Sequence, residues 1–297
     1  MSSGEMRSPD LTSTELRFSV DESLTLVADA WGDPEDAPVV LLHGGGQTRH
    51  AWAGTAATLA AAGWYAIAVD QRGHGESDWA DNGNYERERY ADDLIELAAM
   101  LPSPPVLVGA SLGGMASLLA IHRAQQCIAQ ALVLVDIATR MEAKGLDRIF
   151  AFMQAAPDGF ANLEEAADAV AGYNPHRPRP SDLNGLKKNL RQGKDGRWRW
   201  HWDPRFLDMK TPAEPPRPWN VLDRAAESLT VPTLLVRGRM SDILSEEGAQ
   251  VFLEQVPHAK YADISNAGHM VAGDRNDLFT DAVLEFLTEI QPEAGTL

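Results

Sequence analysis

Predicted strands alternate with helix-forming segments along most of this chain, and this alternation restricts its fold more than any other feature. A strand that is buried on both faces appears as a short, continuous apolar run. Alternation of such strands with helices predicts a parallel sheet with helices packed on both faces. The predicted strands of this kind lie at residues 38–42, 65–70, 106–109, 131–136, 232–236 and 260–264.

Two further segments complete the predicted sheet. Residues 16–20 and 24–30 alternate apolar and polar side chains across a short turn, which favours an antiparallel pair at a sheet edge. We therefore predict an α/β protein with a mostly parallel sheet of about eight strands.

The alternation stops between residues 139 and 225. This stretch contains helix-forming pieces but no convincing strand, and the strands on either side of it continue one pattern. We predict a core domain made of residues 1–138 and 226–297, with a helical cap, or lid, inserted at residues 139–225. The helical pieces of this cap lie at residues 146–155, 163–172 and 181–190.

The charge balance limits the expected partners. Lys and Arg number 26 against 43 Asp and Glu, which gives a formal net charge of −17. Nucleic acids and anionic membranes bind basic surfaces, so we expect neither as a partner. Met1–Asp10 lacks the basic start and apolar run of a signal peptide, and we find no stretch long enough to cross a bilayer. A single cysteine, Cys127, can form no internal disulfide and favours a cytoplasmic protein in which this thiol is inert.

One predicted strand is joined to a predicted helix at residues 115–125 by the segment Gly109-Ala110-Ser111-Leu112-Gly113. A serine at the apex of so sharp a turn takes a strained conformation, and the two glycines remove side chains that would collide there. The turn exposes the hydroxyl of Ser111, and the amide of Leu112 begins a helix whose positive end favours a developing anion. The flanking strand and helix make a nucleophile a better interpretation than a glycine-rich turn that happens to hold a serine.

A serine nucleophile needs a base to take its proton, and that base needs a carboxylate to orient it. His269 follows the predicted strand at 260–264, and Asp242 follows the strand at 232–236. Both residues lie in loops at the carboxyl ends of strands, where open α/β sheets place their sites. The order Ser, Asp, His along the chain matches the α/β-hydrolase arrangement.

Over residues 16–290 the chain resembles the α/β-hydrolase fold superfamily, in particular its capped branch of esterases, lactonases and cofactor-free haloperoxidases. The resemblance implies an α/β-hydrolase fold with an inserted helical cap. Any one of the matching motifs alone would be a weak sign of this superfamily, but together they are highly specific. The motifs are His43-Gly44-Gly45-Gly46, Asp70-x-Arg72-Gly73-x-Gly75-x-Ser77, the serine turn, Gly238-x-x-Ser241-Asp242 and Gly268-His269.

The resemblance also implies a mechanism. His269 would deprotonate Ser111, which would attack a carbonyl carbon while the amides of Gly45 and Leu112 hold the oxyanion, with Gly46 as a further candidate donor. Water activated by His269 would then release the acyl group, without a metal or an organic cofactor. Relatives that open epoxides or remove halide use an aspartate at the position of Ser111, so those reactions are disfavoured.

Two aspartates are candidates for the acid, because some relatives take it from the earlier strand. Asp136 stands directly at a strand end and leads into the cap, whereas Asp242 lies several residues past its strand, in a loop long enough to reach a histidine. The Gly238-x-x-Ser241-Asp242 pattern also matches the commoner arrangement. We therefore predict that Asp242 orients His269 and that Asp136 has a structural or pocket-wall role.

The remaining candidates have simpler interpretations. His43 and His74 lie in glycine-rich turns, where they are expected to tie loops together, and Arg72 is expected to brace the loop after Asp70. The cap tryptophans are equally compatible with packing and with substrate contact. They are Trp198, Trp200 and Trp202. The histidines that match no motif are treated as background, and they are His50, His122, His176, His201 and His258.

The predicted function is a serine hydrolase that cleaves a carboxylic ester or lactone with a largely apolar acyl group. Two rivals remain open. One is another serine-triad reaction, such as that of a C–C hydrolase, a lyase or a perhydrolase, and the other is a non-catalytic small-molecule receptor on the same fold. The sequence does not fix the oligomeric state, and a homo-oligomer is possible.

Overall fold

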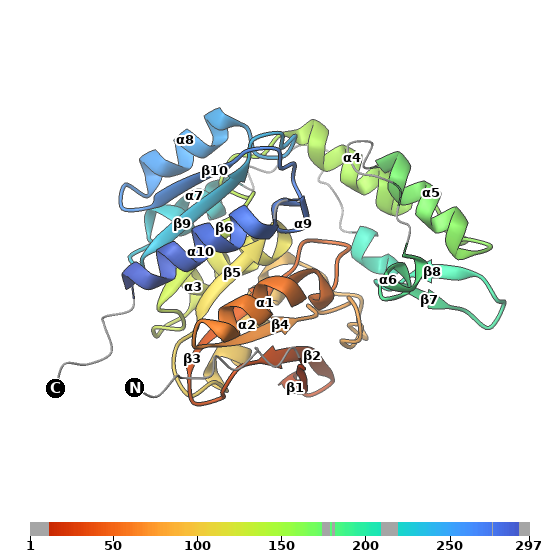
Figure 1. Cartoon of the computed structure of the whole chain (residues 1–297), viewed down its shortest axis with the longest axis horizontal. Helices are drawn as coiled ribbons and strands as arrows, with labels where there is room; N and C mark the ends of the chain where they lie inside the picture. Colours follow the sequence, from red (N-terminus) through yellow and green to blue (C-terminus); the bar gives the residue numbers. More distant parts are fainter. Residues whose placement is uncertain (1–11, 174–178, 180–181, 209–218, 275, 291–297) are drawn as a thin grey trace, which may run out of the picture.

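An eight-stranded sheet forms the centre of this computed structural model, which describes residues 12–173, 179, 182–208, 219–274 and 276–290 (Figure 1). β2 runs antiparallel to β1 and to β4, and the other neighbouring pairs are parallel. The predicted antiparallel pair at the sheet edge is therefore confirmed. Across the sheet the strands follow the order β1 (Thr14–Asp21), β2 (Leu24–Trp31), β4 (Trp64–Val69), β3 (Ala37–Leu42), β5 (Val106–Ala110), β6 (Ala131–Val135), β9 (Thr233–Gly238) and β10 (Lys260–Ile264).

Helices cover both faces of the sheet, and each face has its own apolar core. The short apolar runs supply both cores because alternate side chains of each buried strand point to opposite faces. On one face lie α1 (Ala53–Ala61) and α10 (Asn276–Ile290), with the short η1 (Arg49–Trp52) and α9 (Val271–Asp274) beside them. The other face carries α2 (Arg87–Ala99), α3 (Leu112–Arg123), α7 (Trp219–Glu227) and α8 (Glu246–Gln255).

Between β6 and β9 the chain leaves the sheet and forms what we call the insert, the described part of residues 139–208 (Figure 1). Its helices lie where the sequence predicted helical pieces, but it also contains a hairpin that the sequence analysis missed. The alternation of Trp198, Trp200 and Trp202 with Arg199 and His201 indicates an extended segment, but strands of three residues give no pattern that shows their pairing into a hairpin. The elements of the insert are α4 (Ala143–Gln154), α5 (Leu163–Tyr173), α6 (Leu183–Lys187), β7 (Leu190–Gln192), β8 (Trp198–Trp200) and η2 (Pro204–Asp208).

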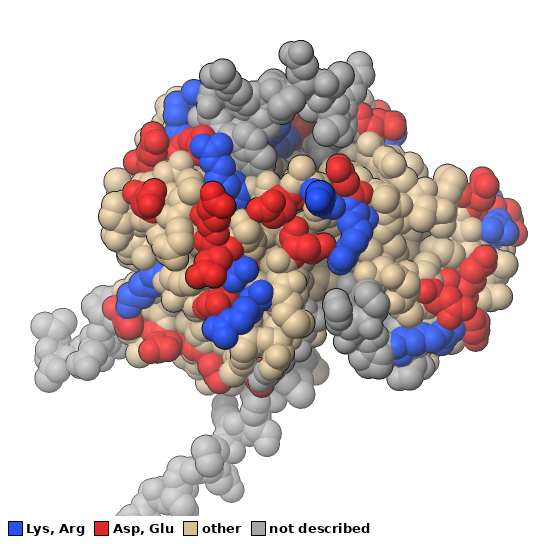
Figure 2. Space-filling view, turned by 90° about the horizontal axis from the view of Figure 1, so that it is seen from above, with Lys and Arg blue, Asp and Glu red and all other residues tan. Residues whose placement is uncertain are grey.

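Some sequence-based predictions concern residues outside the described ranges. They are those on Met1–Asp10 and on His176. Within the described ranges, no helix combines the length and the apolar character needed to cross a membrane. On the face shown in Figure 2, acidic and basic side chains are interspersed, without a separate basic field.

Candidate active site

The turn between β5 and α3 holds Ser111 in a conformation that few non-glycine residues adopt. Its φ is 47° and its ψ is −109°, and such strain is typical of functional positions. A side chain at Gly109 would overlap the backbone of Gly113, and one at Gly113 would overlap Leu42. The two glycines therefore let the strand, the turn and the helix pack tightly enough to form this sharp corner.

His269 lies in the loop after β10, and its ring is oriented by a carboxylate. Nδ1 of His269 donates a hydrogen bond to Oδ2 of Asp136 over 2.7 Å. This bond places the proton on Nδ1 and leaves Nε2 of the imidazole as the basic nitrogen. Ser111 and His269 line the same cavity, so the candidate nucleophile and the candidate base face one space.

Asp136 follows the last residue of β6 and is completely buried, with 0% of its surface exposed. Its φ of 52° turns the chain sharply. Besides His269, the carboxylate accepts hydrogen bonds from the backbone N–H of Gly238 at 2.9 Å and from Oγ of Ser241 at 2.5 Å. These hydrogen bonds give the buried carboxylate oxygens the partners that they would otherwise find in water.

The structure corrects the sequence-based prediction that Asp242 orients His269. The Asp242 side chain is 40% exposed, and its Oδ2 pairs with Nη1 of Arg148 on α4 at 3.1 Å. The loop after β9 does reach the site, but it presents Gly238 and Ser241 to the Asp136 carboxylate. Asp242, one residue further on, is directed to the insert instead.

The glycine-rich loop after β3, residues 44–46, lies in the cavity wall together with Ser111. We call it the oxyanion loop, because the sequence predicts that its Gly45 amide binds the oxyanion. The N–H of Gly44 donates to Gln47 at 2.9 Å, and the N–H of Gly46 donates to Nε2 of His74 at 3.1 Å. Within the described part of the chain, the Gly45 N–H has no protein acceptor. Gly45 is thus the available donor on this loop, and the amide of Gly46 is already used.

Leu112 supplies the second candidate donor. It is the first residue of α3, so its N–H has no acceptor within the helix. The N-terminus of a helix also favours negative charge through its aligned peptide dipoles. Gly45 and Leu112 therefore come from two elements that are far apart in the sequence, and both residues line the cavity.

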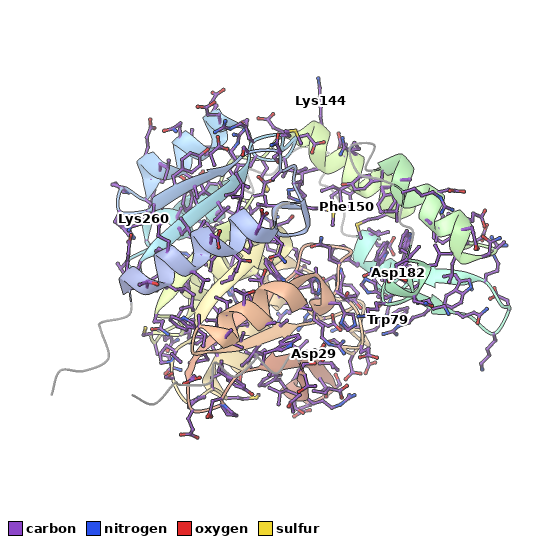
Figure 3. The ribbon with its side chains drawn as sticks, in the orientation of Figure 1. Asp29, Trp79, Lys144, Phe150, Asp182 and Lys260 are labelled. Carbon is purple, nitrogen blue, oxygen red and sulfur yellow. The ribbon has the colours of Figure 1, made fainter. Side chains whose placement is uncertain are left out.

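The cavity has a volume of about 1510 Å³, which exceeds the roughly 300–1,000 Å³ of ordinary ligand pockets. It lies between the core and the insert, and Figure 3 labels Phe150 on α4 and Asp182 at the start of α6, both of which line it. Much of its wall is apolar. The large apolar lining residues include Met115, Ile137, Met141, Leu146, Ile149, Phe150, Phe152, Met153, Trp200, Trp202, Phe206 and Leu222.

Known proteins resemble this chain in sequence and in fold. A family model described as the alpha/beta hydrolase fold matches residues 37–275. The chain belongs to the α/β hydrolase fold family. Among curated proteins, the esterase Rv0045c of Mycobacterium tuberculosis is 28% identical over 253 residues, which cover 82% of this chain and 80% of the esterase. A 3-hydroxybutyrate-oligomer hydrolase of Cupriavidus necator is 27% identical over 252 residues, covering 80% of this chain and 85% of that enzyme.

Solved structures show the same fold. An E-2-(acetamidomethylene)succinate hydrolase superposes with a TM-score of 0.81 and 24% identity, covering 93% of this chain and all of that one, 100%. A structure of the Mycobacterium tuberculosis esterase has a TM-score of 0.74 with 26% identity, over 93% and 92% of the two chains. The α/β-hydrolase fold with its eight-stranded, mostly parallel sheet is thus confirmed.

Two histidines of this hydrolase tie loops together, as the sequence predicted. Nδ1 of His43 donates to the carbonyl of Gly44 at 2.8 Å, while Nε2 accepts from the N–H of Gln71 at 3.0 Å. Nδ1 of His74 donates to the carbonyl of Arg72 at 3.0 Å, while Nε2 accepts from Gly46. Burial lowers the pKa of His43 to about 4 and that of His74 to about 3. Both rings are therefore neutral, which their accepting nitrogens require.

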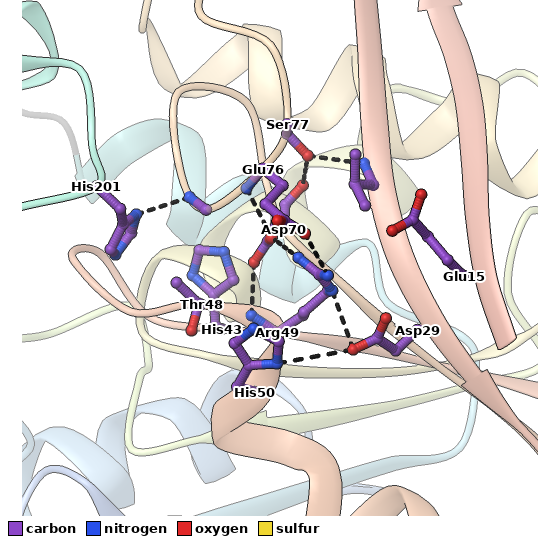
Figure 4. A network of polar contacts seen from close by, with 12 residues as sticks. Glu15, Asp29, His43, Thr48, Arg49, His50, Asp70, Glu76, Ser77 and His201 are labelled. Atoms are coloured by element: carbon purple, nitrogen blue, oxygen red, sulfur yellow. Dashed lines mark hydrogen bonds and ion pairs between the residues drawn. The ribbon is translucent and has the colours of Figure 1, made fainter. Parts of the chain in front are cut away.

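The loop after β4 is fixed by buried ion pairs. The Arg72 guanidinium pairs with Asp93 at 2.5 Å, which confirms that Arg72 braces the loop. Nearby, Arg49 contacts Asp70, Glu76 and Asp29 (Figure 4). A side chain at Gly75 would overlap the Asp70 carboxylate. These pairs join the loop after β3 to the loop after β4 on the hydrolase core.

His201 was treated as background in the sequence, and the structure shows that it is not. It is 1% exposed and lies on the insert, directly after β8. Its Nδ1 accepts a hydrogen bond of 2.6 Å from the N–H of Gly75 in the core (Figure 4). The alternation of Trp198, Trp200 and Trp202 was the signal that could have found it, because His201 must face the opposite way from its two neighbours.

The three tryptophans of the insert have two kinds of surroundings. Trp200 and Trp202 line the cavity and stack on each other, with 5.1 Å between ring centroids. Trp198 packs in the apolar cluster of the insert beside Phe160.

Among the described residues, no group of three or more His, Cys, Asp and Glu side chains is placed to hold a metal ion.

Proposed function

We propose that this hydrolase cleaves carboxylic esters, including lactones, through an acyl-enzyme intermediate on Ser111. The observation that carries the proposal is the meeting of two features in one cavity: a serine on a strained strand-to-helix turn and a histidine oriented by a fully buried carboxylate. Asp136 takes the role that the sequence analysis gave to Asp242. The curated relatives include an esterase and a hydrolase of 3-hydroxybutyrate oligomers, both consistent with this reaction class.

The proposed reaction has two halves. Nε2 of His269 takes the proton of the Ser111 hydroxyl as Oγ forms a bond to the carbonyl carbon, and the carbonyl oxygen becomes an oxyanion held by the Gly45 and Leu112 amides. The oxyanion reforms the carbonyl, the bond to the alcohol oxygen breaks, and His269 returns the proton to that oxygen. Water then attacks the acyl-enzyme with His269 as base, and the acid and free Ser111 are released.

Each part of the site contributes to lowering the barrier. Loss of one oxyanion donor typically costs about 10²–10³ in kcat, or about 3–4 kcal/mol. The carboxylate of Asp136 keeps the Nδ1–H tautomer of His269 and stabilises the imidazolium that forms during both halves. Because Asp136 is buried and has its other hydrogen bonds to Gly238 and Ser241, it is held at a fixed position.

The cavity supports an apolar acyl group as the substrate class. Its large apolar lining residues surround the space next to Ser111, and its volume accommodates a long or bulky group. A dianionic substrate is disfavoured, because the chain carries a net charge of −17 and the carboxylates that line the cavity outnumber the cations Arg87, Lys188 and Arg205. The carboxylates include Glu86, Glu88, Asp147, Asp182 and Asp208.

We also propose that residues 139–225 act as a cap over this cavity, and that the protein acts in the cytoplasm on a small molecule. Helix α4 supports the first proposal, because Leu146, Ile149, Phe150 and Met153 of this one helix all line the cavity. Cys127, the single cysteine in the sequence, supports the second, since a chain with one thiol forms no internal disulfide.

The test is a hydrolysis screen of p-nitrophenyl esters of increasing acyl length together with lactones, using the wild-type protein and Ser111→Ala. We expect turnover by the wild type that rises with apolar acyl size, and loss of nearly all turnover in the variant. An organophosphate should label Ser111, as read by peptide mass spectrometry. Peroxide-dependent activity that exceeds hydrolysis would favour the perhydrolase, and single-turnover labelling without turnover would favour the receptor.

A further inference from the structure

We propose that the insert positions the oxyanion loop through His201 and Phe206, so that the seating of the insert on the core sets the rate of catalysis. The proposal rests on the proposed ester hydrolysis and on the role of the Gly45 amide in it. His201 would be a positioning residue, because it acts through the peptide groups of the loop and does not itself meet the substrate.

His201 links the insert to two loops of the core. Nδ1 of His201 accepts from the Gly75 N–H, so the proton of this neutral ring is on Nε2. Nε2 in turn lies 3.4 Å from the carbonyl oxygen of Gly46, to which it donates. One side chain of the insert therefore binds two core loops at once, with one nitrogen for each.

Three histidines form hydrogen bonds to the peptide groups of the oxyanion loop. His43 donates to the carbonyl of Gly44, His74 accepts from the N–H of Gly46, and His201 donates to the carbonyl of Gly46. These groups belong to three successive peptide units, and each unit is a rigid plane. The Gly45 N–H belongs to the first of these units, and the carbonyl of that unit also accepts a hydrogen bond of 3.1 Å from the Gln47 N–H, which belongs to the unit held by His201. The orientation of the Gly45 N–H therefore depends on both parts of the protein.

Apolar side chains of the insert pack against the oxyanion loop. A side chain added at Gly45 would lie 3.4 Å from the ring of Phe206, and one added at Gly46 would lie 3.0 Å from Met153 and 3.4 Å from Trp202. These three residues belong to the insert and are buried. Phe206 also packs edge-on against His74, with 4.8 Å between centroids. These side chains of the insert therefore pack against the loop at Gly45 and Gly46 and limit its movement in their direction.

Hydrogen bonds attach residues 201–206 to the core. The N–H of Asp203 donates to the carbonyl of Gly73 at 2.9 Å, and the hydroxyl of Tyr85 donates to Oδ2 of Asp203 at 2.6 Å. Arg205 donates to the carbonyl of Ala80 at 2.9 Å. Because this segment is bonded to the core between β4 and α2, His201 and Phe206 have fixed positions from which to hold the oxyanion loop.

The test compares His201→Asn with His201→Gln. The Asn side chain places an acceptor near the position of Nδ1 but cannot reach Gly46, whereas the longer Gln side chain places a donor near the position of Nε2. Each protein is titrated at Ser111 with an organophosphate, and kcat is expressed per titrated serine. His258→Gln is the matched control, because its ring is exposed and bonds to the carbonyl of Val231 on the surface of the core.

We expect His201→Asn to lose about tenfold in kcat with little change in KM, which is less than the loss of a whole oxyanion donor because the Gly46 bond is the longest of the three. His201→Gln should recover most of this loss. A trifluoromethyl ketone, which forms an oxyanion adduct with Ser111, should bind the Asn variant about tenfold more weakly. The matching methyl ketone should bind both variants like the wild type.

Phe206→Leu provides a second test that leaves every hydrogen bond of the loop in place, should the histidine variants fail to fold. It too should weaken the trifluoromethyl ketone more than the methyl ketone. Unchanged kcat per titrated serine and unchanged trifluoromethyl ketone affinity in the folded variants would overturn the inference alone. A wild-type protein that is neither labelled at Ser111 nor active on any ester would instead overturn the proposed function.

Discussion

The ends of β6 and β9 lie side by side in the sheet, and each is followed by an aspartate, yet the two carboxylates have opposite surroundings. Asp136 is buried and receives hydrogen bonds from Gly238, Ser241 and His269. Asp242 is partly exposed and receives one ion pair from Arg148 on the insert. The difference shows that the β9 end supports the carboxylate that binds His269 without providing it, and that its own aspartate serves the contact with the insert.

The largest expected effect comes from removing the charge at the β6 end. Asp136→Asn should lower kcat by about 10⁴, because the amide favours the wrong tautomer of His269. Asp242→Asn is the matched control and should stay within about threefold of the wild type, since an exposed ion pair contributes little. Steady-state kinetics on folded, purified variants measures both, and the reverse ranking would show that Asp242 is the acid.

The next effect tests the closeness of the β9 end to the histidine loop. A methyl group at Gly238 would overlap the carbonyl of Gly268 and lie 2.8 Å from that of Ala267. Gly238→Ala should displace the loop that carries His269, and a shift of about 1 Å costs about 100-fold in kcat. Unfolding in urea should also show a loss of about 1–3 kcal/mol.

The control for this substitution is Gly172→Ala on α5, where an added methyl group meets no atom within 4 Å. This variant should leave kcat unchanged and stabilise the helix by about 0.5–1 kcal/mol. If Gly238→Ala behaved like Gly172→Ala, the tight packing at the β9 end would have no role in placing His269.

A smaller effect should follow from the hydroxyl that joins the two strand ends. Ser241→Ala removes the hydrogen bond to the Asp136 carboxylate, and hydrogen bonds to charged groups contribute about 1.5–3 kcal/mol. We expect a loss of about tenfold in kcat, with Ser241→Thr close to the wild type because it keeps the hydroxyl. Equal activity of the Ala and Thr variants would contradict a role for this bond.

The smallest effect should come from the ion pair on the insert side. A double-mutant cycle with Arg148→Gln and Asp242→Asn should give a coupling of about 0.2–1 kcal/mol in the free energy of unfolding. The coupling should decrease in high salt, because both side chains are exposed. A coupling above about 2 kcal/mol would mean that the β9 end uses its aspartate as strongly as the β6 end does.

Much of the fold follows from the sequence because strands buried on both faces leave continuous apolar runs. The serine turn is also local, since Gly109, Ser111 and Gly113 lie within five residues and their spacing encodes the conformation. The predicted roles of His43, His74 and Arg72 in tying loops together are confirmed for the same reason, as each lies in a glycine-rich segment with little conformational freedom.

The choice of acid is not local, and the sequence argument for it was wrong. Loop length showed that the segment after β9 could reach His269, but not which of its side chains turns inward. That choice depends on Asp136 occupying the buried position at the neighbouring strand end, with the backbone of Gly238 as its partner. His201 was missed for a similar reason, because its partners Gly46 and Gly75 are more than a hundred residues away in the sequence.

The neutral histidines around the oxyanion loop have a consequence for proton binding. In an unfolded chain a histidine has a pKa of about 6.5, whereas burial holds that of His43 at about 4, that of His74 at about 3 and that of His201 well below its usual value. Below about pH 6.5 these histidines therefore bind protons in the unfolded chain but stay neutral in the folded protein. Each such histidine removes about 1.4 kcal/mol of stability per pH unit until the folded pKa is reached. The groups that hold the loop at neutral pH thus make unfolding a proton-consuming reaction in mild acid.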